Sequence, residues 1–248
     1  MSFKEWLFSS YPNPSTSNQW GLGHIASLVL IAIFVVISTI LLKKRSAKDK
    51  RLVLIVLASL ILFFEIARRV INFCKTPGQD LIQSLRTLLP RPGCAIACWL
   101  VMIAVYVNKK IVYNVASIIS ILCGGIFFIY PVAGYNNQYI LFENIYSIIT
   151  HCTFFAVSIC FITYGFTDFK YKGGWKDLIG IAIVFVYAFL EIVFKIEGDP
   201  FFFMANNEVQ EIIGMSYNVY LPCYIVFVLF YINLFYGIRY LKDRCKKA

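Results

Sequence analysis

Cys94 and His151 are the residues in this sequence whose types could together support covalent chemistry. Cys94 follows Pro92, and because proline is tolerated in the first turn of a helix, the thiol should lie close to a helix N-terminus. The unpaired N–H groups and the helix dipole at that end favour a thiolate. An imidazole within hydrogen-bonding distance could take the thiol proton, and the thiolate could then attack an ester carbonyl. The pair is consistent with acyl transfer, although a lone membrane cysteine or histidine more often serves in packing.

The composition places these residues in a membrane. Of the 248 residues, 60% are hydrophobic and only 15% are charged. Windows of about 20 apolar residues, the length that crosses a hydrocarbon core of ~30 Å, recur along the whole chain. We predict an all-α, single integral membrane domain over residues 1–248. It would comprise an interfacial lead at 1–19, a bundle of seven transmembrane helices at 20–241 and a basic cytoplasmic tail at 242–248.

The basic residues predict the orientation of this bundle. Its spans are expected at about 20–42, 52–73, 92–107, 111–130, 143–166, 177–196 and 218–240. Sixteen of the 23 Lys and Arg residues lie in the tail, at the end of the last span or in the loops after the first, third and fifth spans, whereas five lie in the lead, in the other loops or at the end of the sixth span. This asymmetry predicts a multi-pass cell-membrane protein with its N-terminus outside and its C-terminus in the cytoplasm. The net charge of +10 is explained by topology, so we expect no nucleic-acid partner.

With this orientation, the ionisable groups inside the spans fall in the outer half of the membrane. Charges at such depth cost a few kcal/mol each on insertion scales, so they should face the bundle interior and pair. Glu65 precedes Arg68 and Arg69 by three and four residues, so it can neutralise one arginine and leave the other for an anionic headgroup. We therefore predict one polar cavity that opens toward the outer leaflet. Its candidate substrate-binding residues are His24, Glu65, Arg68, Arg69, Arg91, Glu191, Asn206 and Asn207.

The cysteine pattern argues against a metal centre. The eight cysteines are at positions 74, 94, 98, 123, 152, 160, 223 and 245. They form no CxxC pair, so neither a zinc site nor a disulfide framework is expected, and we expect no cofactor. Cys98 lies one helical turn beyond Cys94 and is a second candidate thiol. Most of the others are expected to be small apolar fillers.

Several short motifs carry a resemblance that covers nearly the whole chain. They are Gly21 to His24, Leu89-Pro90-Arg91-Pro92-Gly93-Cys94, Glu143 to Tyr146 followed by His151, Met204 to Asn207 followed by Gly214, and Leu221 to Ile225. This ordered set resembles the YwaF-like integral membrane family and, more distantly, the transmembrane protein 164 group of lipid acyltransferases.

The resemblance implies a function for two of these residues. In the acyltransferase group, a cysteine at the third span and a histidine at the fifth span are the implied catalytic pair, which correspond here to Cys94 and His151. The sequence departs from bacterial relatives at Pro92, where a histidine is common, so any proton relay through that histidine is absent. Membrane lipids or a lipidated molecule would be the substrate.

Two other functions are consistent with the same residues. A transporter or substrate-capture protein could bind a small anionic or polar solute at Glu65, Arg68 and Arg69, although the chain shows no inverted repeat. A structural membrane scaffold would use the same charges only to pair with one another. Uptake that depends on Arg68 but not on Cys94 would favour the transporter, and loss of folding on replacing Arg68 or Glu65 would favour the scaffold.

Overall fold

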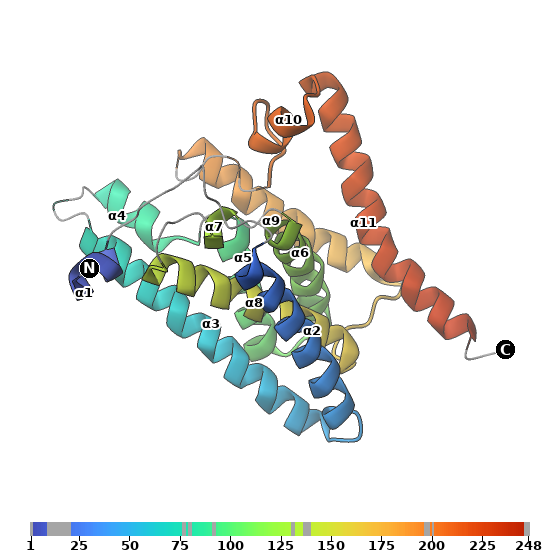
Figure 1. Cartoon of the computed structure of the whole chain (residues 1–248). Coiled ribbons are helices and arrows are strands. Elements are labelled where there is room, and N and C mark those ends of the chain that lie inside the picture. Colours follow the sequence, from blue (N-terminus) through green and yellow to red (C-terminus); the bar gives the residue numbers. More distant parts are fainter. Residues whose placement is uncertain are drawn as a thin grey trace.

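The chain folds into helices connected by short loops. The computed structural model describes residues 2–8, 21–75, 78, 81–90, 93–129, 132–135, 140–195, 199 and 201–245. The long helices are α2 (Leu22–Leu42), α3 (Ala47–Lys75), α5 (Gly93–Val107), α6 (Lys110–Ile129), α8 (Phe142–Thr163), α9 (Gly174–Val193) and α11 (Tyr217–Cys245). The short ones are α1 (Phe3–Phe8), α4 (Leu81–Leu88), α7 (Val132–Tyr135) and α10 (Glu208–Ile213). The described residues contain no strand, in agreement with the predicted all-α class (Figure 1).

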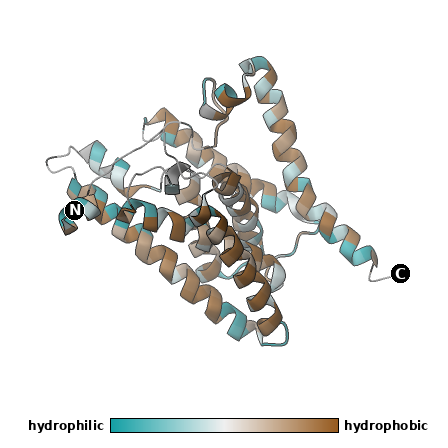
Figure 2. Ribbon diagram, in the orientation of Figure 1, coloured by the Kyte–Doolittle hydropathy of each residue, from teal (hydrophilic) through white to brown (hydrophobic). Residues whose placement is uncertain are grey.

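The surface of the bundle is suited to lipid. Figure 2 shows apolar helices whose hydrophilic residues gather near the helix ends. In α2, Leu22, Leu30 and Ile40 are 86%, 65% and 67% exposed, whereas His24 is fully buried. A helix that turns apolar side chains outward and its one histidine inward is expected where the surrounding solvent is hydrocarbon.

Four helices are long and apolar enough to cross a membrane: α2, α6, α8 and α11. Helix α5 is equally apolar but has only 15 residues. Helices α3 and α9 have sufficient length but carry more charge: Glu65, Arg68 and Arg69 in α3, and Lys176 and Asp177 in the first turn of α9 with Glu191 near its end. The protein is thus a helical membrane protein, and the count of seven spans and the orientation of the termini stay predictions.

Helices α5, α6 and α8 form the centre of the bundle. Helix α5 packs against α3, α6 and α8, and α8 also contacts α2 and α3. Helix α6 is buried continuously from Tyr113 to Ser120. The α6–α8 contact needs a glycine at position 124, because a Cβ there would lie 2.5 Å from the ring of Phe155. This close packing brings residues of α8 against residues of the consecutive helices α5 and α6.

Helix α11 crosses α9 on the side of the bundle away from α3 (Figure 1). Most of its side chains are exposed, and two tyrosines anchor it. Tyr231 Oη donates to the carbonyl oxygen of Ile118 at 2.9 Å, and Tyr236 Oη donates to Asp177 Oδ2 at 2.6 Å. Its exposed apolar residues are consistent with contact with lipid.

The helix boundaries differ from the expected spans in two ways. First, α4, α7 and α10 form within segments expected to be loops. Second, α3 begins at Ala47 and α11 continues to Cys245, so helix extends into the basic loop and into the predicted tail at 242–248. An apolar run shows which part of a helix lies in the membrane, but it does not show where the backbone hydrogen bonds of the helix end. Lys and Arg are good helix formers, so the helix can continue through charged residues. Most of the predicted interfacial lead lies outside the described residues.

Candidate functional site

Cys94 is the second residue of α5, where backbone N–H groups have no partner within the helix. Its thiol is partly buried, whereas Cys98 and Cys123 are buried. The side chain of Cys94 lies close enough to His151 and Cys123 to interact with both, and it interacts electrostatically with Arg68. The thiol therefore lies among a base, a cation and the positive end of a helix.

The imidazole of His151 is held in one orientation. Its Nδ1 lies 2.7 Å from the carbonyl oxygen of Ser147, one turn earlier in α8. Because a carbonyl oxygen can only accept, Nδ1 must carry the proton and Nε2 is left as the basic nitrogen. The ring of Phe127 stacks on the imidazole with centroids 3.9 Å apart and limits its rotation. The contact with Ser147 and the stacking on Phe127 thus fix the orientation of the ring and leave Nε2 as its unprotonated nitrogen.

Next to the thiol is a cluster of three charges on α3. Glu65 Oε2 accepts from Arg69 Nη2 at 2.8 Å and from Arg68 Nη2 at 3.4 Å. The guanidinium of Arg68 lies over the ring of Tyr146 at 5.2 Å, and that of Arg69 lies over Trp99 at 5.8 Å. One carboxylate faces two guanidinium groups, so the cluster carries one excess positive charge.

Arg69 also connects this cluster to the segment that leads into α5. Its Nη1 donates to the carbonyl oxygen of Leu89 at 2.6 Å and to that of Thr87 at 3.4 Å. Leu89 is five residues before Cys94 in the sequence. Arg69 therefore joins α3 to the end of α4 and to Leu89.

The remaining candidates lie at different distances from the thiol. Glu191 is 1% exposed, and Tyr187 interacts with both Glu191 and Arg69, which connects α9 to the charged cluster. His24 is buried against Phe128 and Tyr135, with ring centroids 6.4 Å and 5.5 Å away. His24 thus lies in a neighbouring aromatic group and not against Cys94.

The two asparagines organise the loop between α9 and α11. Asn207 caps α10, since its side-chain oxygen accepts from the backbone N–H of Gln210. Its side-chain nitrogen donates to the carbonyl oxygens of Phe202 and Met204. Asn206 is exposed and has a positive φ of 60°. The structure gives these residues loop contacts and no contact with the Cys94 thiol, and Arg91 lies outside the described residues.

Two polar features were missed by sequence reasoning. Cys123 on α6 lies beside Cys94, and its Sγ is 3.7 Å from the carbonyl oxygen of Gly93. No spacing rule connects a thiol on α6 with one on α5. At the opposite end of α9 from Glu191, the buried carboxylate of Asp177 accepts from Asn114 at 2.7 Å. Buried ionisable groups are therefore not confined to the end of the bundle that holds Cys94.

The described residues contain no group of three or more His, Cys, Asp or Glu side chains that could hold a metal ion. The arrangement defines an all-helical membrane protein with a thiol and an oriented imidazole within interaction distance of each other. The family model of the TMEM164 family matches residues 19–236, and the chain belongs to this family. Comparisons with curated proteins and with solved structures find no match.

Proposed function

We propose that the protein is a membrane-embedded lipid acyltransferase or transacylase that uses Cys94 as nucleophile and His151 as general base. The observation that carries the proposal is the orientation of His151. Its Nδ1 is committed to the Ser147 carbonyl at 2.7 Å while its side chain is within interaction distance of the Cys94 thiol. Covalent acyl transfer requires a nucleophile next to a general base, and a third group that orients this base. Here the Ser147 carbonyl oxygen orients His151 and selects its tautomer.

The reaction follows from these positions. His151 Nε2 accepts the thiol proton, and the Cys94 thiolate attacks an ester carbonyl of a lipid to form a tetrahedral intermediate. As the carbon–oxygen ester bond breaks, the departing alkoxide takes the proton from the imidazolium and leaves as a lysolipid. The hydroxyl of a second lipid then gives its proton to His151, attacks the thioester and releases the Cys94 thiol with that proton.

The charge that develops on the carbonyl oxygen needs stabilisation. The unpaired N–H groups in the first turn of α5 and the nearby Arg68 guanidinium are suited to this role. Arg69 would act as a positioning residue, since it binds the Leu89 carbonyl oxygen and not the thiol. Membership of the TMEM164 family and the resemblance to its lipid acyltransferases support the same assignment.

The test is acyl exchange by the purified protein in lipid vesicles. One phospholipid carries an isotope-labelled acyl chain, an unlabelled lysolipid is the acceptor, and mass spectrometry measures transfer of the label. We expect Cys94→Ser to abolish transfer and His151→Gln to lower its rate about 10²- to 10⁴-fold, the usual contribution of a general base. A labelled acyl group that hydroxylamine releases should be found on Cys94.

Cys98→Ser is the matched control, because this thiol lies one turn further along the same helix and is buried. We expect this variant to retain transfer. Transfer that persists in Cys94→Ser, or that is lost only in Cys98→Ser, would overturn the proposed mechanism.

A further inference from the structure

A polar pocket lies where α1, α3 and α8 meet. It has a volume of about 110 Å³ and is lined by Leu7, Arg68, Ile71, Asn72, Lys75, Phe142, Glu143 and Tyr146. Helix α3 has 29 residues, so at ~1.5 Å per residue it is longer than a hydrocarbon core of ~30 Å. The C-terminal end of α3 at Lys75 therefore reaches the level of the lipid headgroups, and Arg68 lies about two turns deeper.

The charges around this pocket favour an anion. Two cations, Arg68 and Lys75, and one carboxylate, Glu143, are among the lining residues. The lining of the pocket therefore carries one excess positive charge, which a phosphodiester with its single negative charge would balance. Guanidinium and ammonium groups are the side chains that bind phosphate oxygens most strongly.

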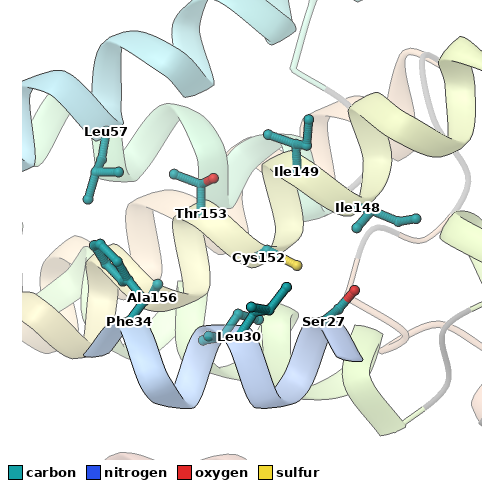
Figure 3. A pocket seen from close by; sticks show the side chains of 10 residues that line it. Ser27, Leu30, Phe34, Leu57, Ile148, Ile149, Cys152, Thr153 and Ala156 are labelled. Carbon is teal, nitrogen blue, oxygen red and sulfur yellow. The ribbon is translucent and has the colours of Figure 1, made fainter. Parts of the chain in front are cut away.

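A second, apolar groove lies further along α8, between α8 and α2 (Figure 3). Its volume is about 310 Å³, and its lining residues are Ser27, Leu30, Ile31, Phe34, Leu57, Ile148, Ile149, Cys152, Thr153 and Ala156. Figure 3 shows Leu30 and Phe34 of α2 on one side and Cys152 and Thr153 of α8 on the other. An apolar groove at the surface of a membrane bundle is suited to a hydrocarbon chain.

One stripe of α8 connects the pocket and the groove. Phe142 and Tyr146 line the pocket, and Ile149, Thr153 and Ala156 line the groove. These positions are spaced by four, three, four and three residues, so they share one helix face. From Phe142 to Ala156 the helix rises ~21 Å, which is about half of the 40–45 Å thickness of a bilayer with its headgroups.

We propose that this stripe is a binding site for one glycerophospholipid of a single leaflet. Its phosphodiester occupies the pocket at Arg68 and Lys75, and an acyl chain lies in the groove beside Ile149 and Thr153. The groove lies on another face of α8 than His151, because Cys152 lines the groove while its neighbour His151 faces the core. Arg68 is shared with the proposed catalytic site, whereas Lys75 and the groove residues are not, so lipid binding is tested through them and does not require acyl transfer.

Native mass spectrometry of the purified full chain tests the site. Phosphatidylglycerol, diacylglycerol and inorganic phosphate are titrated separately, so that the headgroup, the chains and the free anion are distinguished. We expect phosphatidylglycerol to bind at least tenfold more tightly than diacylglycerol or inorganic phosphate. A phosphatidylglycerol with a photoreactive group in its acyl chain should cross-link to the groove residues of α2 and α8.

Two variants separate the parts of the site, each with a matched control. Lys75→Gln should weaken phosphatidylglycerol binding about tenfold, the value of one hydrogen bond to a charged group, whereas Lys44→Gln in the loop before α3 should not. Thr153→Trp should fill the groove and abolish its cross-links, whereas Ile183→Trp, at a 64% exposed position of α9, should not.

Several results would overturn the proposal. One is equal binding of diacylglycerol and phosphatidylglycerol, and another is binding of inorganic phosphate as tight as that of the lipid. Cross-links spread evenly over the exposed faces of α9 and α11, or binding unchanged in both Lys75→Gln and Thr153→Trp, would also contradict it.

Discussion

Cys94 is distinguished from the other cysteines by its neighbours. Its residue type occurs eight times in the chain, and Cys98, Cys123 and Cys160 are buried while Cys74 and Cys245 are exposed. Cys94 alone among these begins a long helix next to an imidazole whose tautomer is determined. Position and not residue type therefore makes Cys94 the candidate nucleophile, since a thiol buried among apolar groups is inert.

The charges of α3 give a prediction at this scale. In Glu65→Gln, the guanidinium groups of Arg68 and Arg69 lose the carboxylate that they share, and we expect the free energy of unfolding to fall by about 3–5 kcal/mol. In Arg69→Gln, Glu65 keeps its contact with Arg68, so the loss should be smaller. Thermal unfolding in one detergent, compared with an exposed Lys48→Gln control, measures both.

Equal destabilisation by Glu65→Gln and Arg69→Gln would contradict this view of the cluster. The double variant Glu65→Gln/Arg69→Gln gives a further check. It removes one of the two guanidinium groups that share the lost carboxylate, so we expect its stability to lie above that of Glu65→Gln.

At the scale of elements, α8 is the helix around which the site is organised. It contacts α2, α3, α5, α6 and α7. Its core face holds His151, and its outer face lines the apolar groove with Thr153. Successive residues on a helix point about 100° apart, so one helix can present a base to the interior and a groove to lipid.

Attachment of α11 gives a prediction at the element scale. Tyr236 is the buried donor that joins α11 to Asp177 of α9, and Asn114 of α6 donates to the same oxygen. Because a hydrogen bond to a charged group contributes about 1.5–3 kcal/mol, Tyr236→Phe should lower the free energy of unfolding by that amount. The exposed Tyr240→Phe should change it by less than ~0.5 kcal/mol.

Thermal and denaturant unfolding of the two variants measures this difference. Limited proteolysis adds a local readout, because a loosened α11 should be cut faster between α10 and α11 in Tyr236→Phe. Identical stability and cleavage in both variants would show that the Asp177 contact does not anchor α11.

At the scale of the whole molecule, the exposed cysteines test the predicted topology. Cys74 lies in the last turn of α3, and Cys245 ends α11. With the N-terminus outside and seven spans, Cys74 lies at the outer face and Cys245 in the cytoplasm. A membrane-impermeant maleimide should therefore label Cys74 in right-side-out vesicles and Cys245 in inside-out vesicles.

Cys74→Ser and Cys245→Ser identify each labelled site by mass. Labelling of both cysteines from the same side would refute the seven-span topology. Labelling of Cys245 from outside and Cys74 from inside would reverse the orientation of the bundle.

The all-helical membrane class could be predicted from the sequence, because an apolar run of about 20 residues is a local feature with the length needed to cross the hydrocarbon core as a helix. The candidate residues Cys94, His151, Arg68 and Arg69 were also recognisable by type. Helix ends were less predictable, since α11 continues to Cys245 through charged residues. The short helices α4, α7 and α10 carry no apolar span to mark them.

A helical membrane protein with a few buried charges is predictable from the amino-acid sequence, because hydrocarbon excludes unpaired polar groups at every position. Which of those groups meet depends on how the helices pack. Cys94 and His151 lie 57 residues apart, and the packing of α5, α6 and α8 brings them together. The contacts of the Cys123 thiol and of Asp177 join different helices, so they depend on helix rotation, which side-chain packing sets and no local pattern encodes.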